Sequence, residues 1–245
     1  MAKQQEKPGA APKAVHPDVE ELMAHLEQTQ NIGSLSRLGL PNEVVEKELN
    51  KALKIIVERR GIDYIDDYDR DLRLQIAEFF SQSSVHQGLL LFGSWGTGKS
   101  SMLKAIARAM TDFYAAMPSA FNGLEVYRFN ALRMSAYDFK SPIIDERLFM
   151  EACDASLLLL DDIGLENGCP ETQRFSRELI GEVLLKRYDR MKPTVLASIF
   201  DIESLSDIYG RHVAEIMKEV YATITMETSY RNFIVYDPKN KISSI

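Results

Sequence analysis

Short apolar runs alternate with amphipathic helical segments along most of this 245-residue chain. A continuous apolar run of about five residues is typical of a strand buried on both faces of a parallel sheet. Such runs, with some less uniform stretches, predict strands at 88–92, 124–129, 156–160, 194–198, 221–226 and 233–236. Apolar residues three or four positions apart predict helices at 68–81, 98–112, 142–153, 171–190, 202–208 and 210–219. Strands that alternate with helices predict an α/β fold with a central parallel sheet flanked by helices.

The N-terminal quarter of the chain has a different pattern. Residues 1–17 are rich in Lys, Ala, Gln and Pro and have little to bury, so we expect a disordered tail there. Apolar stripes predict one helix at 18–29 and another from Asn42 to just before Gly61. The predicted organisation is a tail, a helical region that either docks a partner or caps the chain, and an α/β domain: 1–17, 18–61 and 62–245.

Composition narrows the class of protein. With 45% hydrophobic and 27% charged residues, the chain has an ordinary globular composition. Its net charge of -7 indicates that any nucleic-acid contact is confined to one surface or is secondary to a protein partner. Two cysteines, Cys153 and Cys169, are too few for a disulfide framework or a four-ligand zinc site. With no membrane-length apolar run and no signal-peptide pattern, a cytoplasmic protein without a membrane partner is expected.

The segment from Gly93 to Ser100 fits the phosphate-binding pattern G-x-x-x-x-G-K-[ST] at every fixed position. A predicted strand precedes it and a predicted helix follows it, whereas a chance glycine-rich turn would lack this context. Glycines let successive backbone N–H groups point at phosphate oxygens, and the N-terminus of the helix adds its positive end. Lys99 is expected to reach the outer phosphates of ATP, and the Ser100 hydroxyl to coordinate Mg²⁺. The predicted nucleotide-binding residues are Gly93, Ser94, Trp95, Gly96, Thr97, Gly98, Lys99, Ser100 and Ser101.

Trp95 has a second interpretation, in which its partly exposed ring only shields the loop.

An acidic pair, Asp161 and Asp162, directly follows the apolar run Leu157–Leu160. A carboxylate at the carboxyl end of a buried strand lies where ligands collect in open α/β sheets. We expect Asp161 to hold Mg²⁺, directly or through water, and Asp162 to orient or deprotonate the attacking water. Alone the pair is a weak signal, since a solvated turn at Gly164 would have the same sequence. Its position some 60 residues after the phosphate loop favours a functional role.

The order and spacing of later motifs resemble AAA+ ATPases of the DnaC/IstB group, which are bacterial and phage replicative-helicase loaders and transposition helper ATPases. The resemblance covers about residues 70–235. Besides the entry to the phosphate loop, the segments that carry it are Leu157–Gly164, Lys186–Tyr188, Pro193–Ser198, Ile208–Arg211 and Ser229–Arg231.

This resemblance implies an ATP site at a subunit boundary of an ATP-dependent homo-oligomer, where a neighbouring subunit supplies an arginine to the γ-phosphate. Arg211 is the first candidate for that arginine, with Arg187 and Arg190 as alternatives. Arg187 equally suits a purely structural role at the end of its own helix. The resemblance also implies a replicative helicase or another DNA-processing protein as the partner, gripped through the N-terminal region.

The sensor positions depart from the family pattern. The family has an asparagine after the serine at Ser198, but here Ile199 follows it. Farther along, His212 and Glu215 stand near positions where the family pattern has an arginine. We therefore expect Ser198 to orient water alone, and hydrolysis to be weakened while ATP binding is retained.

Basic and aromatic residues interleave between the second predicted strand and the next helix, a pattern that suits single-stranded nucleic acid. The alternative, slightly favoured, is a strand with alternating faces followed by an ordinary amphipathic helix. The residues concerned are Tyr127, Arg128, Phe129, Arg133, Tyr137, Phe139 and Lys140.

Three functional hypotheses follow. The first is a helicase-loader-like ATPase that acts on a replicative helicase at DNA. The second is an ATP-dependent adaptor for a transposase or another DNA-processing partner, with poor turnover, which the sensor departures favour. The third is a small-molecule kinase on the same scaffold, against which the adjacent aspartates and the Tyr-Gly-Arg and Ser-Tyr-Arg elements argue.

Overall fold

A computed structural model describes residues 42–67, 69–80, 86–116, 130–139, 146–166, 169–227, 234–235 and 243–244. The predicted tail, the helix at 18–29 and the strand at 124–129 lie outside the described residues, as do Lys140 and the Ser229–Arg231 motif. The division of the chain at residues 17 and 61 stays a prediction.

Five parallel strands form the central sheet in the order β2-β3-β4-β1-β5. The phosphate-loop strand β1 lies between β4 and β5, with Phe92 opposite Ser198 on one side and Thr225 on the other. β4 separates β1 from the acidic strand β3. The strands are β1 (Gly88–Phe92), β2 (Ala131–Ser135), β3 (Leu157–Asp161), β4 (Thr194–Ser198) and β5 (Tyr221–Thr225). A short antiparallel pair, β6 (Ile234–Val235) and β7 (Ser243–Ser244), follows.

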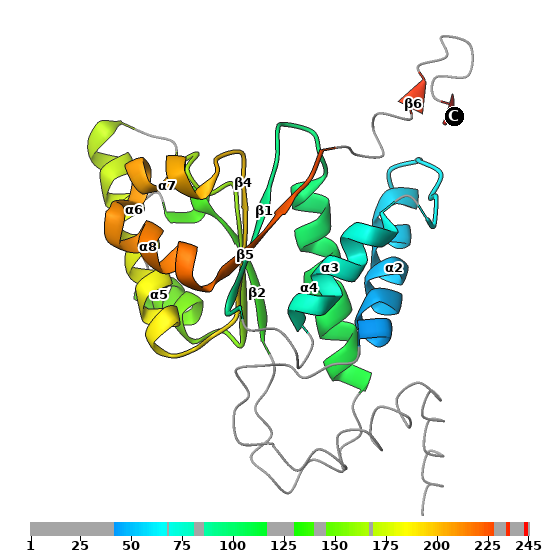
Figure 1. Cartoon of the computed structure of the whole chain (residues 1–245), viewed down its shortest axis with the longest axis horizontal. Coiled ribbons are helices and arrows are strands. Elements are labelled where there is room, and N and C mark those ends of the chain that lie inside the picture. Colours follow the sequence, from blue (N-terminus) through cyan, green and yellow to red (C-terminus); the bar gives the residue numbers. More distant parts are fainter. Residues whose placement is uncertain are drawn as a thin grey trace, which may run out of the picture.

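Helices cover both faces of the sheet, which confirms the predicted α/β fold (Figure 1). One face packs against α2 (Asn42–Glu58), α3 (Arg70–Phe80) and α4 (Lys99–Ala116). The other packs against α5 (Glu146–Asp154), α6 (Pro170–Asp189), α7 (Ile202–Tyr209) and α8 (Arg211–Val220). Successive side chains of β1 enter the two cores in turn: Leu89 and Leu91 on one side, Leu90 on the other. None of the helices in the described ranges is long and apolar enough to cross a membrane.

The position of β2 differs from the sequence prediction. Residues 131–135, which lie between the predicted strand at 124–129 and the predicted helix at 142–153, form a strand, and the 3-10 helix Ala136–Phe139 follows it. β2 is an edge strand, so only its Met134 is fully buried and its apolar pattern does not identify a strand. Residue-by-residue pairing with β3, from Ala131 opposite Leu157 to Ser135 opposite Asp161, decides the conformation instead.

Arg187 holds elements together at the amino ends of the sheet strands. The phosphate loop lies at the opposite, carboxyl ends of the strands. Its guanidinium is buried and donates to Ala152 O (2.9 Å), Ala155 O (2.8 Å), Pro193 O (2.6 Å) and Thr194 Oγ1 (2.8 Å). Burial lowers the pKa of Arg187 to about 10. These acceptors end α5 and precede or begin β3 and β4, so Arg187 joins three elements.

This geometry corrects the hypothesis that Arg187 serves a neighbouring subunit, because its donors are enclosed within its own chain. Arg190 lies at the same amino edge, where it pairs with Asp154. Neither arginine therefore reaches out from the edge of the sheet at which the phosphate loop lies.

We predict that Arg187→Met destabilises the fold by about 3–5 kcal/mol, because several buried acceptors lose a charged donor. Arg190→Met is the matched control: it removes a partly exposed ion pair and is expected to cost about 1 kcal/mol or less. Urea unfolding of the two variants checks the prediction, and equal losses of stability would contradict it.

Candidate nucleotide site

The phosphate loop joins the end of β1 to the start of α4. Gly96 and Gly98 have φ values of 83° and 95°, in the left-handed region that glycine adopts readily. Gly93 is needed for a different reason, because a Cβ there would lie 2.3 Å from the backbone oxygen of Met226. The Met226 N–H donates to Phe92 O at 2.7 Å, so the chain beyond β5 lies directly against the loop.

Lys99 is buried inside the loop. Its ammonium donates to Gly93 O at 2.6 Å and Ser94 O at 2.7 Å. Burial lowers the pKa of Lys99, against the opposing effect of Asp162 and Asp161. The lysine thus lies beside the acidic pair and on the loop, where a phosphate group would meet it.

The loop and the acidic strand meet at Ser100. Its hydroxyl donates to Asp161 Oδ1 at 3.1 Å, although β4 lies between the two strands. Asp161 is buried, and the same oxygen accepts the Asp162 N–H at 3.1 Å. Two hard oxygen donors therefore converge at one point, and such a donor set fits Mg²⁺.

Asp162 begins a buried turn. Its backbone is left-handed, with φ 58°, a conformation that aspartate tolerates better than most residues. Burial and the neighbouring Asp161 raise the pKa of Asp162, while Lys99 lowers it. Ile163 is fully buried, so the turn is not the solvated one that the sequence also allowed.

Ser198 ends β4 and its hydroxyl already has two partners. It donates to Ile163 O at 2.9 Å and accepts the Phe200 N–H at 2.9 Å. The hydroxyl therefore fastens the acidic turn to β4, and this is a different task from the water orientation that the sequence suggested.

Arg211 is the first residue of α8, and 89% of its side chain is exposed. Its Nε donates to Glu215 Oε1 at 2.7 Å. The arginine lies apart from the loop contacts of its own chain and is presented to solvent.

The aromatic and basic residues predicted near the site differ in their exposure. Trp95 is 69% exposed on the phosphate loop. Phe139 is fully buried in the core, so it takes no part in a nucleic-acid surface. Arg133, from the same stretch, points at the acidic pair instead, with Nη1 4.0 Å from Asp161 Oδ2. The described part of the basic and aromatic stretch therefore does not form a continuous binding strip.

Three residues beside the acidic turn were not predicted from the sequence as site residues: Glu166, Arg177 and Tyr209. Glu166 is a buried carboxylate whose Oε2 accepts Arg177 Nε at 3.2 Å, and the Tyr209 hydroxyl donates to its Oε1. The available signal was an acidic residue two positions after Gly164, which resembled an ordinary solvated turn.

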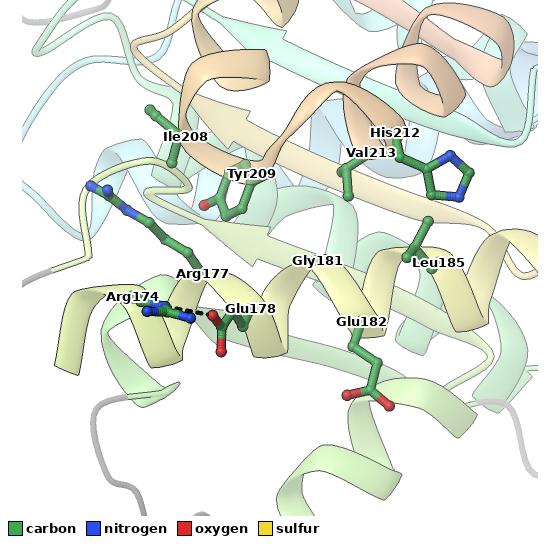
Figure 2. Close-up of a pocket in the computed structure, with 10 residues that line it drawn as sticks. All are labelled: Arg174, Arg177, Glu178, Gly181, Glu182, Leu185, Ile208, Tyr209, His212 and Val213. Atoms are coloured by element: carbon green, nitrogen blue, oxygen red, sulfur yellow. Dashed lines mark hydrogen bonds and ion pairs between the residues drawn. The ribbon is translucent and has the colours of Figure 1, made fainter. Parts of the chain in front are cut away.

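A groove of about 490 Å³ lies between α6 and the junction of α7 with α8, not at the phosphate loop (Figure 2). Arg177, Tyr209 and His212 are among its lining residues.

A phosphate loop after β1, an acidic strand one strand away and helices on both faces of a parallel sheet define the fold of a P-loop nucleoside-triphosphatase. The model of the KAP family P-loop domain matches residues 70–237, and the chain belongs to this family.

The chain is also 28% identical over 148 residues to the replicative helicase loader DnaI of Bacillus subtilis (strain 168). This match confirms the resemblance to the helicase-loader group. It covers 60% of this chain and 44% of that protein, so the chain spans less than half the length of the curated relative that it matches.

The chain is also similar to solved structures. A putative primosome component from Streptococcus pyogenes serotype M3 is 21% identical, with a TM-score of 0.50 over 82% of this chain and 98% of that one. A crystal structure of DnaI is 21% identical, with a TM-score of 0.49 over 71% of this chain and 93% of that one.

We predict that Gly93→Ala destabilises the fold by about 2–4 kcal/mol, because the new methyl group would meet a backbone oxygen that cannot rotate away. It should also weaken nucleotide binding, since the loop must shift. Gly61→Ala is the control: φ there is +72° but nothing lies within 4 Å of the new Cβ. That control is expected to cost about 1–2 kcal/mol and to leave nucleotide binding unchanged. Urea unfolding and nucleotide titration of both variants test this, and an equal loss of affinity would contradict it.

Proposed function

We propose that this chain binds ATP with Mg²⁺ and hydrolyses it as a helicase-loader-like AAA+ protein that acts on a replicative helicase at DNA. The observation that supports the nucleotide site best is the Ser100–Asp161 hydrogen bond of 3.1 Å, because it joins the phosphate loop to the acidic strand. The similarity to DnaI supports the biological role.

Backbone N–H groups of residues 93–98 and the N-terminus of α4, including Ser100 and Ser101, hold the phosphates in this proposal. Lys99 exchanges its two loop carbonyls for the outer phosphate oxygens. Because its present partners are neutral carbonyls at 2.6 and 2.7 Å, a doubly charged phosphate is the stronger acceptor.

Ser100 and Asp161 hold Mg²⁺ in this proposal, and the ion offsets the negative charge of the phosphates when it is bound. Asp162 then orients the attacking water and accepts its proton. Burial and Asp161 raise the pKa of Asp162, so the carboxylate is a stronger base than an exposed aspartate.

Arg211 acts on the nucleotide of a neighbouring subunit in an ATP-dependent homo-oligomer. Its exposure supports this role, and its ion pair with Glu215 is a surface pair four residues along the same helix. Solvent screens such an exposed pair, so a phosphate can replace it readily. An arginine supplied in this way raises phosphoryl-transfer rates about 10³–10⁵-fold in other systems.

A second candidate function is the weakly hydrolysing ATP-dependent adaptor for a transposase or another DNA-processing partner. One observation favours it: the Ser198 hydroxyl is engaged by Ile163 O and the Phe200 N–H, and Ile199 offers no polar group for water. In that case assembly and partner binding depend on ATP, while turnover is slow.

The first test measures ATP binding and hydrolysis for the native chain, Lys99→Ala and Arg211→Ala, with and without single-stranded DNA and candidate helicases. We expect Lys99→Ala to lower ATP affinity by about 100-fold, since a charge-assisted contact to phosphate is lost. Arg211→Ala should keep that affinity and lower the rate by about 10³-fold or more. Hydrolysis that is independent of protein concentration and of Arg211 would contradict a shared site.

Asp162→Asn separates the two candidate functions. It keeps the size of the side chain but removes the base, so we expect bound ATP and intact assembly with hydrolysis reduced about 10²–10⁴-fold. If helicase loading or partner binding persists in this variant, the adaptor function is favoured. If both are lost along with hydrolysis, turnover is part of the task. Phosphate transfer to a small acceptor without any assembly would contradict both.

A further inference from the structure

A buried carboxylate holds the turn that follows Asp162. Glu166 Oε1 accepts the Gly164 N–H at 3.0 Å, and its Oε2 accepts Arg177 Nε at 3.2 Å. The Gly164 N–H also donates to the Tyr209 hydroxyl oxygen at 2.8 Å, while that hydroxyl donates to Glu166 Oε1. The side chain of Glu166 is fully buried, so these partners replace water around its charge.

The other backbone N–H groups of the turn are also hydrogen-bonded. The N–H groups of Asp162, Ile163 and Leu165 donate to Asp161 Oδ1, Ala197 O and Asp162 O, each at 3.1 Å. Every backbone N–H from 162 to 165 therefore has an acceptor.

Gly164 adds a steric constraint on the same turn. Its φ is +87°, and a Cβ there would lie 2.6 Å from the Phe200 ring. The turn is thus closely confined, and the hydrogen bond from its Gly164 N–H to the Tyr209 hydroxyl connects it to α7.

Helix α7, which carries Tyr209, ends two residues before Arg211, the arginine proposed to act on a neighbouring subunit. Tyr209 is the last residue of α7, Gly210 forms the corner with φ 89°, and Arg211 is the first residue of α8. Figure 2 shows Arg177 rising from α6 toward Ile208 and Tyr209, with the groove between α6 and the corner. Apolar side chains of α7 and α8 pack against α6 beside this groove, and the polar contacts of Glu166 with Arg177 and Tyr209 add a hydrogen-bonded link between α6 and the corner.

We propose that Glu166 and Tyr209 couple the acidic turn of a subunit to the Arg211 that the same subunit offers to its neighbour. The inference rests on the proposed shared ATP site. It adds a physical connection between the nucleotide site of one subunit and that of its neighbour. A shift of the turn moves the Gly164 N–H and the Glu166 carboxylate, and Tyr209 carries that shift across one glycine to Arg211. Coupling of this kind is reciprocal, so the position of Arg211 also biases the position of Asp162.

The chemistry of the link suits this task. Burial and the adjacent Glu166 carboxylate raise the pKa of Tyr209 well above its usual value, so its hydroxyl stays protonated and donates. Arg177 balances the charge of Glu166, which would otherwise be costly to bury. The hydrogen bonds of Tyr209 and Glu166 run to Gly164, to Arg177 and to each other and not to Lys99 or Ser100, so they are positioning residues and not catalytic ones.

The test mixes two full-length chains that are each inactive. The donor chain carries Asp162→Asn, which keeps Arg211 but cannot hydrolyse its own ATP. The acceptor chain carries Arg211→Ala, which keeps its own nucleotide site but supplies no arginine to a neighbour. Their mixture should restore hydrolysis in the acceptor sites. Adding Tyr209→Phe to the donor should lower the restored rate about three- to tenfold, the size of a typical coupling. ATP affinity should not change, since the phosphate loop is untouched.

Tyr188→Phe in the donor is the matched control, because Tyr188 is a half-buried tyrosine farther along α6, and it should leave the restored rate unchanged. Glu166→Gln in the donor repeats the test without loss of volume, and urea unfolding verifies that each variant is folded. If Tyr209→Phe and Glu166→Gln lower the rate only in the acceptor, or in neither chain, the coupling is refuted. If the two parent chains restore no hydrolysis, the shared site is refuted and the coupling with it.

Discussion

Parallel pairing of β1 with β4, and of β4 with β3, is the constraint on which the site depends. It brings the carboxyl ends of three strands to one edge of the sheet, where β1 continues into the phosphate loop and β3 ends at Asp161. Helix α4 then turns back over the sheet, and its second residue, Ser100, reaches across to Asp161 at 3.1 Å. The two motifs are about 60 residues apart in the sequence, and this pairing is what brings them together in space.

One buried cation lies at the carboxyl ends of the strands and another at the amino ends. Both donate to backbone carbonyls, but in different surroundings. Lys99 lies in the phosphate loop beside two carboxylates. Arg187 is enclosed by α5, β3 and β4, and burial lowers its pKa to about 10. In the proposed function a phosphate replaces the carbonyls around Lys99, whereas Arg187 and its acceptors are enclosed within the chain, so the first cation suits binding and the second suits stability.

The acidic turn connects stability and chemistry. Ser198, Glu166 and Tyr209 hold its backbone from three sides, so Asp162 stands at the corner of a fixed turn with a raised pKa. A preorganised carboxylate needs little rearrangement to accept a proton. In the proposed function, the engagement of the Ser198 hydroxyl leaves the orientation of water to Asp162.

The amino-acid sequence determined the parts of this protein that rest on local chemistry. Buried strands such as Leu157–Leu160, the glycines of the phosphate loop, and the order of the motifs Lys99–Ser100 and Asp161–Asp162 follow from apolar runs and backbone requirements. Only the tertiary structure decided the conformation of β2, the burial of Arg187 and Phe139, and the cluster of Glu166 with Arg177 and Tyr209. Each of these depends on contacts between distant segments. An edge strand, a buried cation and a carboxylate after a turn have the same local pattern as exposed residues until a partner from elsewhere in the chain removes them from water.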